Sequence, residues 1–173
     1  MPSHLDIGSS THRTRSDILK GRRHLLSYQA KLNYIRALES TSLEYTVVNN
    51  GVFMDYWVAP HVKTYLGGGI DFVIDMANKT AAIPGTGDTP LVFTYSFDIG
   101  NLVAALLTLP TWEKESFIVG DRVTWNQFLA IAEEARGSKF KTTHDSLEFL
   151  KKKQVTELPS HQVVYRFLPK EIV

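Results

Sequence analysis

Apolar and polar residues along this 173-residue chain follow two different periods. In residues 24–40 apolar side chains recur every three or four positions, which predicts an amphipathic helix. Residues 44–48 are rich in β-branched and aromatic side chains and predict a strand, and Asn49-Asn50-Gly51 has the composition of the turn that ends it. Helical and strand-like segments continue to alternate from there on, which favours the α/β class.

The middle of the chain is expected to contain a hairpin followed by a helix. Residues 80–83 and 91–96 have the composition of strands, and the glycine-containing residues 84–88 predict a hairpin turn between them. Residues 84–88 resemble a phosphate-binding loop only superficially, because strand-like segments lie on both sides. Asp98 is expected to cap the next helix, and Pro110 is expected to stop it.

A second helix is expected farther along, with signals at both of its ends. Thr124 and Gln127 have the spacing of a capping box, and Gly137 suits the left-handed residue that follows a helix. The other expected elements are a partly helical segment at 52–66, strands at 116–119 and 140–143, a short helix at 147–153, a loop at 1–22, a flexible break at 67–69 and an aperiodic tail from 155.

The composition narrows the classes of function. A net charge of +1 argues against binding to nucleic acid or to a membrane surface through global electrostatics. The chain contains no Cys, which excludes disulfides, thiolate zinc sites and cysteine nucleophiles, and suits the cytoplasm. The six His show no metal-ligand spacing, so no metal site is expected. No apolar run is long enough to cross a bilayer.

Lys31 is the candidate for acid–base chemistry. On a helical wheel of residues 24–40 it falls inside the apolar arc, and a lysine that faces a buried surface is suited to giving up its proton. In the alternative, its stem packs on the apolar face while its amine reaches water, and the spacing alone favours this alternative. Glu39 also falls inside the arc, so the position of Lys31 is not unique.

The turn after the predicted strand is a candidate ligand site, because α/β domains bind ligands outside the carboxyl ends of strands. Gly51 permits close approach of the backbone to a ligand, and the Asn50 side chain can bind an amide or a ribose. Phe53, Tyr56 and Trp57 can wall an apolar pocket. An ordinary turn and an ordinary aromatic core are the alternatives, and the residues by themselves leave them open.

Several segments together resemble a known family. K-x-x-x-I-R-A-L-E followed by L-E-Y-T-V-V-x-x-G-x-F, and then the segments at 81–100, 117–140 and 145–160, resemble the NmrA-like, isoflavone-reductase-like branch of the short-chain dehydrogenase superfamily, especially its fungal members. The resemblance implies reduction of a small, often aromatic metabolite with NADPH, in secondary metabolism. Lys31 would then bind the nicotinamide ribose and serve acid–base chemistry. Asn50, Gly51 and Phe53 would lie beside the nicotinamide, and Phe53, Tyr56 and Trp57 would face the substrate.

The chain departs from this family in one respect, because no strand with a glycine-rich pyrophosphate-binding turn precedes Lys31. We therefore expect an amino-terminally truncated member with a single domain at 1–173. In that domain, 1–66 would be the second half of a doubly wound, Rossmann-like fold that lacks its first βαβ unit. Residues 67–173 would be mainly a small α+β substrate-binding lobe.

Two classes of function follow from this resemblance. The first is an NAD(P)H-dependent oxidoreductase that reduces a small metabolite, although the missing phosphate-binding loop removes a large share of dinucleotide binding. The alternative is a non-catalytic protein: a dinucleotide-sensing or protein-binding regulator, or a degenerate subunit that needs a partner. A protein partner is expected to cover the sheet edge that the missing strands would expose.

Overall fold

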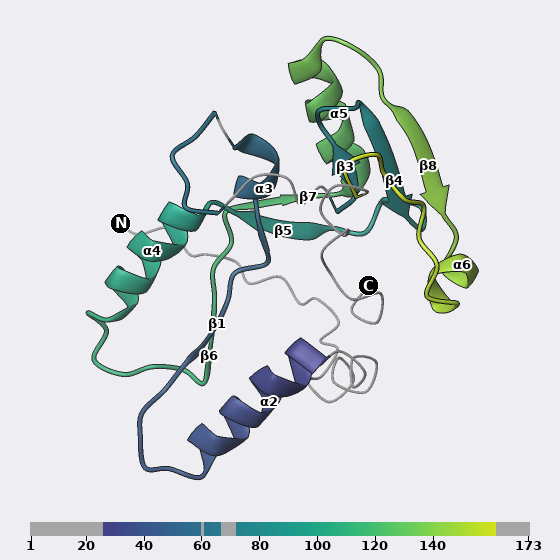
Figure 1. Cartoon of the computed structure of the whole chain (residues 1–173). Coiled ribbons are helices and arrows are strands. Elements are labelled where there is room, and N and C mark those ends of the chain that lie inside the picture. Colours follow the sequence, from purple (N-terminus) through teal and green to yellow (C-terminus); the bar gives the residue numbers. More distant parts are fainter. Residues whose placement is uncertain (1–25, 60, 67–71, 162–173) are drawn as a thin grey trace. The chain divides into compact units, whose positions relative to one another are not determined.

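The computed structural model describes residues 26–59, 61–66 and 72–161 (Figure 1). By its internal contacts the chain divides into two compact units, Met1–Val47 and Val48–Val173. The loop predicted at 1–22, the break at 67–69 and the last part of the tail lie outside the described residues. The predicted single domain, with a Rossmann-like part at 1–66 and mainly a substrate-binding lobe at 67–173, stays a prediction.

Helix α2 (Leu26–Glu39) is the helix found among the described residues of the first unit. It confirms the helix predicted at 24–40, as far as the described residues reach. Leu32 is buried and Ile35 and Leu38 are half-buried, whereas the residues between them are exposed. This alternation is the one that the spacing of three and four predicts for a helix with one apolar face.

Short strands form three sheets in the described residues, and Figure 1 labels all of these strands except β2. Two strand pairs, β2 with β5 and β4 with β8, are parallel, whereas β3 with β4 and β5 with β7 are antiparallel. Together with the interspersed helices they confirm the α/β class. The sheets consist of β1 (Val47–Asn49) with β6 (Glu115–Phe117); β2 (Val52–Phe53) with β5 (Leu91–Thr94) and β7 (Asp121–Val123); and β3 (Ile74–Asp75) with β4 (Thr80–Pro84) and β8 (Lys141–Asp145).

The hairpin predicted across residues 84–88 is wrong. β4 and β5 both exist, but β4 lies between β3 and β8, whereas β5 lies between β2 and β7. The turn is held instead by the start of α5 (Trp125–Arg136), where the side-chain amide of Asn126 donates to Thr86 O at 2.9 Å and to Asp88 Oδ1 at 2.7 Å. β4 pairs with β3 and β8, and β5 pairs with β2 and β7, so the two strands do not pair with each other.

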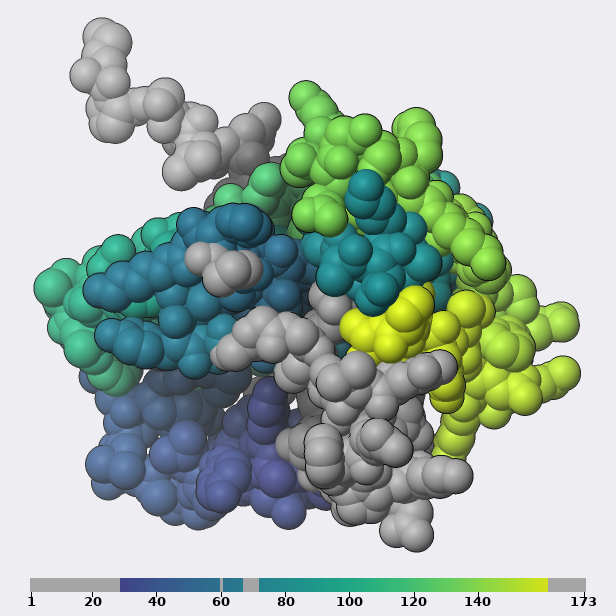
Figure 2. Space-filling view, turned by 45° about the horizontal axis from the view of Figure 1, so that its top comes forward, coloured from purple at the N-terminus to yellow at the C-terminus, as the bar shows by residue number. Residues whose placement is uncertain are grey.

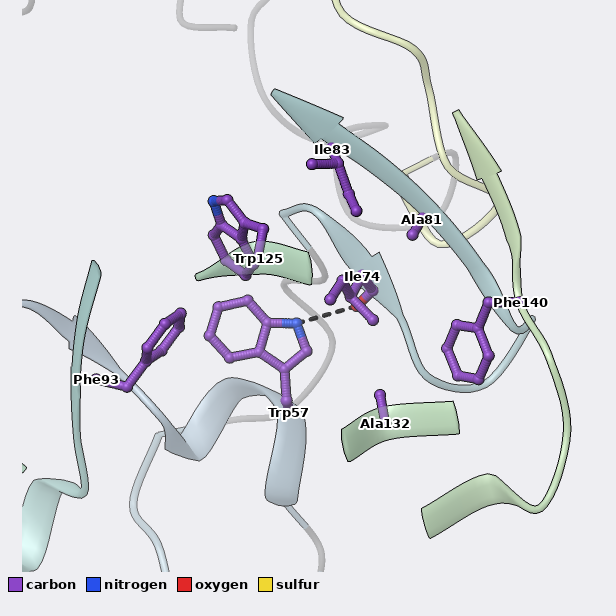
Figure 3. Close-up of a cluster of buried hydrophobic side chains, with 8 residues drawn as sticks. All are labelled: Trp57, Ile74, Ala81, Ile83, Phe93, Trp125, Ala132 and Phe140. Atoms are coloured by element: carbon purple, nitrogen blue, oxygen red, sulfur yellow. Dashed lines mark hydrogen bonds between the residues drawn. The ribbon is translucent and has the colours of Figure 1, made fainter. Parts of the chain in front are cut away.

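Buried aromatic rings form the core of the second unit (Figure 3). The indole of Trp57 contacts the rings of Phe93 and Trp125 edge to face, with centroids 5.7 and 5.6 Å apart. Its Nε1 donates to Ile74 O at 3.0 Å, so the polar atom of this buried ring is satisfied. The buried cluster consists of Trp57, Ile74, Ala81, Ile83, Phe93, Trp125, Ala132 and Phe140.

Helix α5 confirms its predicted boundaries. The Thr124 side chain accepts a hydrogen bond from the backbone of Gln127, and the Gln127 side chain accepts one from the backbone of Thr124. Gly137 follows the helix in the left-handed conformation, with φ of 61°. The buried residues of α5, Trp125 and Ala132, belong to the aromatic core. The capping signals in the sequence and the packing in the core therefore both favour a helix over these residues.

Helix α4 (Ser96–Leu106) is present as predicted, but the expected cap by Asp98 is wrong. The helix begins two residues earlier, so Asp98 lies inside its first turn and is exposed. The residue before the helix, Tyr95, makes no side-chain cap hydrogen bond. The first backbone N–H of the helix, that of Ser96, donates instead to Asp55 Oδ2 at 2.9 Å.

The segment that follows α6 (Leu147–Lys151) is tied to the third sheet by buried carboxylates. Asp75 Oδ2 accepts from Ser160 N at 3.0 Å, and Asp145 Oδ2 accepts from Thr156 N at 2.9 Å. Burial raises the pKa of Asp75, but hydrogen bonds from Asn78 and Ser160 outweigh it, so the net pKa is lowered. Figure 2 shows this segment, in yellow, against the teal residues of β3 and β4.

Among the described residues, no helix combines the length and the apolar composition that crossing a bilayer requires.

Candidate functional site

The strand-end loop, residues 50–58, follows β1 and contains every predicted site residue except Lys31. Its turn depends on Gly51, whose φ is +71°. A Cβ added at Gly51 would lie 2.3 Å from Val92 O, so a side chain there would clash with the backbone of β5. The close backbone approach that the glycine permits is therefore one to β5 of the same unit.

Thr94 holds the strand-end loop in place and was missed by the sequence reasoning. It is fully buried, and its hydroxyl donates to Asn50 O at 2.8 Å while accepting from Gly120 N at 3.2 Å. Its own carbonyl accepts from Met54 N at 3.1 Å. In the sequence Thr94 resembles any other β-branched residue of a strand. The signal available in the sequence was Gly120, because an isolated glycine often marks a close approach between two backbone segments.

The last four residues of the strand-end loop form α3 (Asp55–Val58), which begins at a fully buried carboxylate. Asp55 Oδ1 accepts from the hydroxyls of Thr64, at 2.6 Å, and Ser96, and Oδ2 accepts from Ser96 N. Burial raises the pKa of Asp55, but the hydrogen bonds from Ser96 and Thr64 together lower it below its ordinary value. With both oxygens committed to these donors, Asp55 fixes the loop against α4 and is not a catalytic candidate.

The three aromatic residues predicted to face a substrate differ in their burial. Trp57 is 4% exposed and belongs to the core. Phe53 and Tyr56 are half-buried and contact each other edge to face, with centroids 6.1 Å apart. Of the three rings, those of Phe53 and Tyr56 therefore keep exposed surface on this loop, whereas the Trp57 ring packs in the core and contacts Tyr56. Whether they touch a substrate stays a prediction.

Trp57 also lines an apolar cavity of about 220 Å³, together with side chains of α5, β5 and β7. Neither Phe53 nor Tyr56 lines this cavity. Of the three aromatic residues predicted to wall one pocket, Trp57 therefore lines the cavity, whereas Phe53 and Tyr56 lie outside it.

The side chain of Asn50 offers the hydrogen-bonding chemistry of the strand-end loop. It is half-buried, and its amide nitrogen lies 3.4 Å from Gly51 O, at the long limit of a hydrogen bond. A side-chain amide both donates and accepts, which matches the carboxamide of a nicotinamide or the hydroxyls of a ribose. The loop therefore fits the expected nicotinamide end of a cofactor site in its chemistry.

Lys31 lies on α2 in the first unit, and the residues of the strand-end loop lie in the second. The Lys31 side chain is exposed. Its role in acid–base chemistry stays a prediction. In the described part of the chain, no three His, Asp or Glu side chains group closely enough to hold a metal ion.

The chain is similar in sequence to fungal proteins that are named oxidoreductases. It is 39% identical over 137 residues to Oxidoreductase BOA1 of Botryotinia fuckeliana (strain B05.10), a match that covers 79% of this chain and 44% of the relative. It is 31% identical over 128 residues to Oxidoreductase swnN of Metarhizium robertsii, covering 72% of this chain and 37% of that protein. The chain thus spans less than half the length of these curated relatives. No family model matches the chain.

Two solved structures share the fold. The crystal structure of isoflavone reductase aligns with a TM-score of 0.58 and 20% identity, covering 80% of this chain and 44% of that one. The apo form of AtPrR2 aligns with a TM-score of 0.54 and 16% identity, covering 85% and 49%. Both coverages agree with the expected fold, in which this chain corresponds to part of an isoflavone-reductase-like domain.

Proposed function

The chain belongs to the NmrA-like, isoflavone-reductase-like family of oxidoreductases, and we propose that it carries the nicotinamide-facing part of an NADPH-dependent reductase. The substrate would be a small, aromatic or secondary metabolite. Since the curated relatives are more than twice as long as the matched part, the polypeptide that binds the pyrophosphate would be supplied from outside these 173 residues. We keep the cytoplasm as the proposed compartment because the chain has no Cys.

The observation that carries this proposal is the construction of the strand-end loop. Gly51 is held against Val92 O, and the buried Thr94 hydroxyl fixes Asn50 O at 2.8 Å. A cofactor-binding loop must hold its polar groups in place before the ligand arrives, and such preorganisation lowers the entropic cost of binding. The half-buried amide of Asn50 stands at the end of a strand, where α/β domains bind ligands.

In the proposed reductase, each predicted site residue of this chain would have its own role in binding or catalysis. The Asn50 amide would pair with the carboxamide or ribose, Gly51 would keep the backbone close to β5, and the Phe53 ring would lie beside the nicotinamide. Lys31 would hold a ribose hydroxyl and give a proton to the reduced product. NADPH, when bound, supplies the hydride. Phe53 and Tyr56, with Trp57 behind them, would exclude water from the substrate.

The test combines this chain with the part of the Botryotinia relative that it does not match. NADPH binding to the mixture is followed by the fluorescence of the reduced nicotinamide. Asn50→Ala should weaken binding by about fivefold to tenfold, because one hydrogen bond is lost. The matched control Asn101→Ala removes an exposed amide on α4 and should leave binding unchanged. Equal affinities of the two variants would contradict the placement of Asn50.

Lys31 is tested in the same mixture by turnover. Lys31→Ala should abolish NADPH oxidation while the circular dichroism spectrum stays that of the wild type. Arg36→Ala removes another exposed cation from the same helix and should retain activity. Turnover that survives Lys31→Ala would remove Lys31 from the mechanism.

A second candidate is a non-catalytic subunit or regulator that binds another protein. It is favoured by the exposed apolar side chains of α4 and the residues after it, where Leu102 is 47% and Leu107 65% exposed. Light scattering of the chain with and without the unmatched part of the relative shows whether a complex forms, and NADPH oxidation by that complex separates the candidates. A complex that binds NADPH but shows no oxidation with any of a panel of small aromatic ketones would favour the regulator.

A further inference from the structure

The second unit contains a cavity of about 220 Å³ that the proposed reductase chemistry does not use. Its walls come from α3, β5, β7 and α5 and from Met54 and Met76, which all lie within Val48–Val173. None of the four residues predicted to touch the dinucleotide lines it; they are Lys31, Asn50, Gly51 and Phe53. Its binding properties can therefore be considered independently of a cofactor.

Aromatic rings form the inner wall of the cavity. Trp57, Phe93 and Phe128 contact one another, with ring centroids between 5.1 and 5.7 Å apart. The one polar atom of Trp57 already donates to Ile74 O, so the indole presents no unpaired donor to the cavity. Figure 3 shows Trp57 and Phe93 together with Ala132, which also lines the cavity. Such a wall favours a flat ligand that can contact the rings edge to face or offset.

One charged residue, Asp121, is among those that line the cavity. It is exposed, as is the lining residue Ile131, so the cavity reaches the surface beside them. Asp121 Oδ1 accepts from Arg122 N at 2.7 Å, and a carboxylate has capacity for further donors. A carboxylate at the opening disfavours an anion and favours a ligand that carries an N–H or O–H group.

The volume limits the size of the ligand. An apolar cavity of about 150 Å³ is sufficient for benzene, whereas typical pockets for drug-sized ligands begin at about 300 Å³. A cavity of about 220 Å³ lies between these limits. It therefore suits one ring or two fused rings.

We propose that this cavity binds a small uncharged aromatic molecule with one N–H or O–H donor, of the chemical class of indole. The rings of Trp57, Phe93 and Phe128 contact its flat apolar part, and Asp121 accepts from its donor. This site goes beyond the proposed reductase function, because it requires neither NADPH nor Asn50, Gly51 and Phe53, the loop residues assigned to the cofactor.

The first test is a titration of the full 173-residue chain with indole, without NADPH, by isothermal titration calorimetry. Indole should bind with a dissociation constant below about 1 mM, since a ligand of this size can gain more than about 4 kcal/mol. Ala135→Leu places a larger side chain on a residue that lines the cavity and should weaken binding at least about tenfold. The matched control Ala130→Leu lies on the same helix, is exposed and does not line the cavity, so it should bind as the wild type does. No binding by the wild type, or equal weakening by both variants, would overturn the proposal.

A second variant tests the donor contact separately and does not alter the packing of α5. Benzothiophene has nearly the shape of indole but lacks the N–H. Asp121→Ala should lower the preference for indole over benzothiophene by about fivefold to tenfold, the loss expected for one hydrogen bond to a charged group. An unchanged preference would overturn the role of Asp121. The urea midpoint of each variant, followed by circular dichroism, shows that the comparison is made on folded protein.

Discussion

Helices α4 and α5 have nearly the same length, 11 and 12 residues, but they are held in different ways. α5 has its own caps, Thr124 and Gly137, and it buries side chains in the aromatic core. α4 has no side-chain cap of its own, and none of its residues is fully buried against the part of the chain that the structure describes. Its first N–H is bound by Asp55, which lies 41 residues earlier.

The difference shows where the stability of a helix originates. For α5 the stabilising groups are neighbours in sequence, so the sequence and the fold carry the same signal. For α4 a carboxylate from α3 takes the place of the local cap and also favours the positive end of the helix dipole. The tie to Asp55 is therefore the feature that sets the start of α4, while its apolar side chains remain largely uncovered among the described residues.

The largest expected contrast comes from removing one apolar side chain from each helix. Trp125→Ala should lower the free energy of unfolding by about 3–5 kcal/mol, because it opens a cavity in the core. Leu102→Ala on α4 should cost less than about 1 kcal/mol, because Leu102 is 47% exposed. Urea unfolding followed by tryptophan fluorescence for the α4 variant, and by circular dichroism for both, checks this. Similar losses would show that α4 is packed as firmly as α5.

The next contrast concerns the two carboxylates near the start of α4. Asp55→Ala should cost about 2–3 kcal/mol, because it leaves Ser96 N and two hydroxyls without their charged acceptor. Asp98→Ala, at the residue that the sequence suggested as the cap, should cost less than about 1 kcal/mol, since Asp98 is exposed. Equal costs would mean that the distant tie does not hold the helix.

Acid provides an independent check on Asp55. Its pKa is lowered in the folded chain, so its contribution is complete above the ordinary value of 3.8 and is lost as the pH falls through the folded value. The urea midpoint of the wild type should therefore fall between about pH 5 and about pH 3, and that of Asp55→Ala should fall less over the same interval. Asp75 also has a lowered pKa, and it contributes equally to the pH dependence of both proteins. If the urea midpoints of the wild type and of Asp55→Ala fell in parallel, the lowered pKa of Asp55 would be contradicted.

The smallest expected effect concerns the capping box of α5. Thr124→Ala should lower the free energy of unfolding by about 1 kcal/mol, the usual cost of removing a side-chain cap. Thr124→Ser keeps a hydroxyl that can accept from Gln127 N and should retain most of the stability. If both variants lose the same amount, the methyl group of Thr124 and not its hydroxyl would be responsible.

Much of the secondary structure could be predicted from the sequence because its signals are local. The capping box and Gly137 defined α5, and the spacing of apolar residues defined α2. Strand pairing could not be predicted, because β4 and β5 are close in sequence yet pair with β8 and β2 in different sheets. The two-residue strands β2 and β3 are too short to leave a periodic pattern in the sequence.

The candidate site shows the same division between local and distant information. Composition and resemblance indicated Asn50, Gly51 and the three aromatic residues of the strand-end loop. Thr94 and Asp55, which hold that loop through hydrogen bonds to distant partners, have no signature in sequence spacing. From the sequence alone, Trp57 could equally be a core residue or a pocket residue. In the structure it is both, because its side chain is buried in the core and also lines the cavity.

Calorimetric titration of the 173-residue chain with NADPH tests the central claim most directly. These residues would provide the nicotinamide-facing loop without a glycine-rich turn for the pyrophosphate, and such a turn supplies a large share of dinucleotide affinity. We expect no measurable binding below about 1 mM for the chain alone, and binding once the unmatched part of the relative is added. Micromolar binding by the chain alone would contradict it.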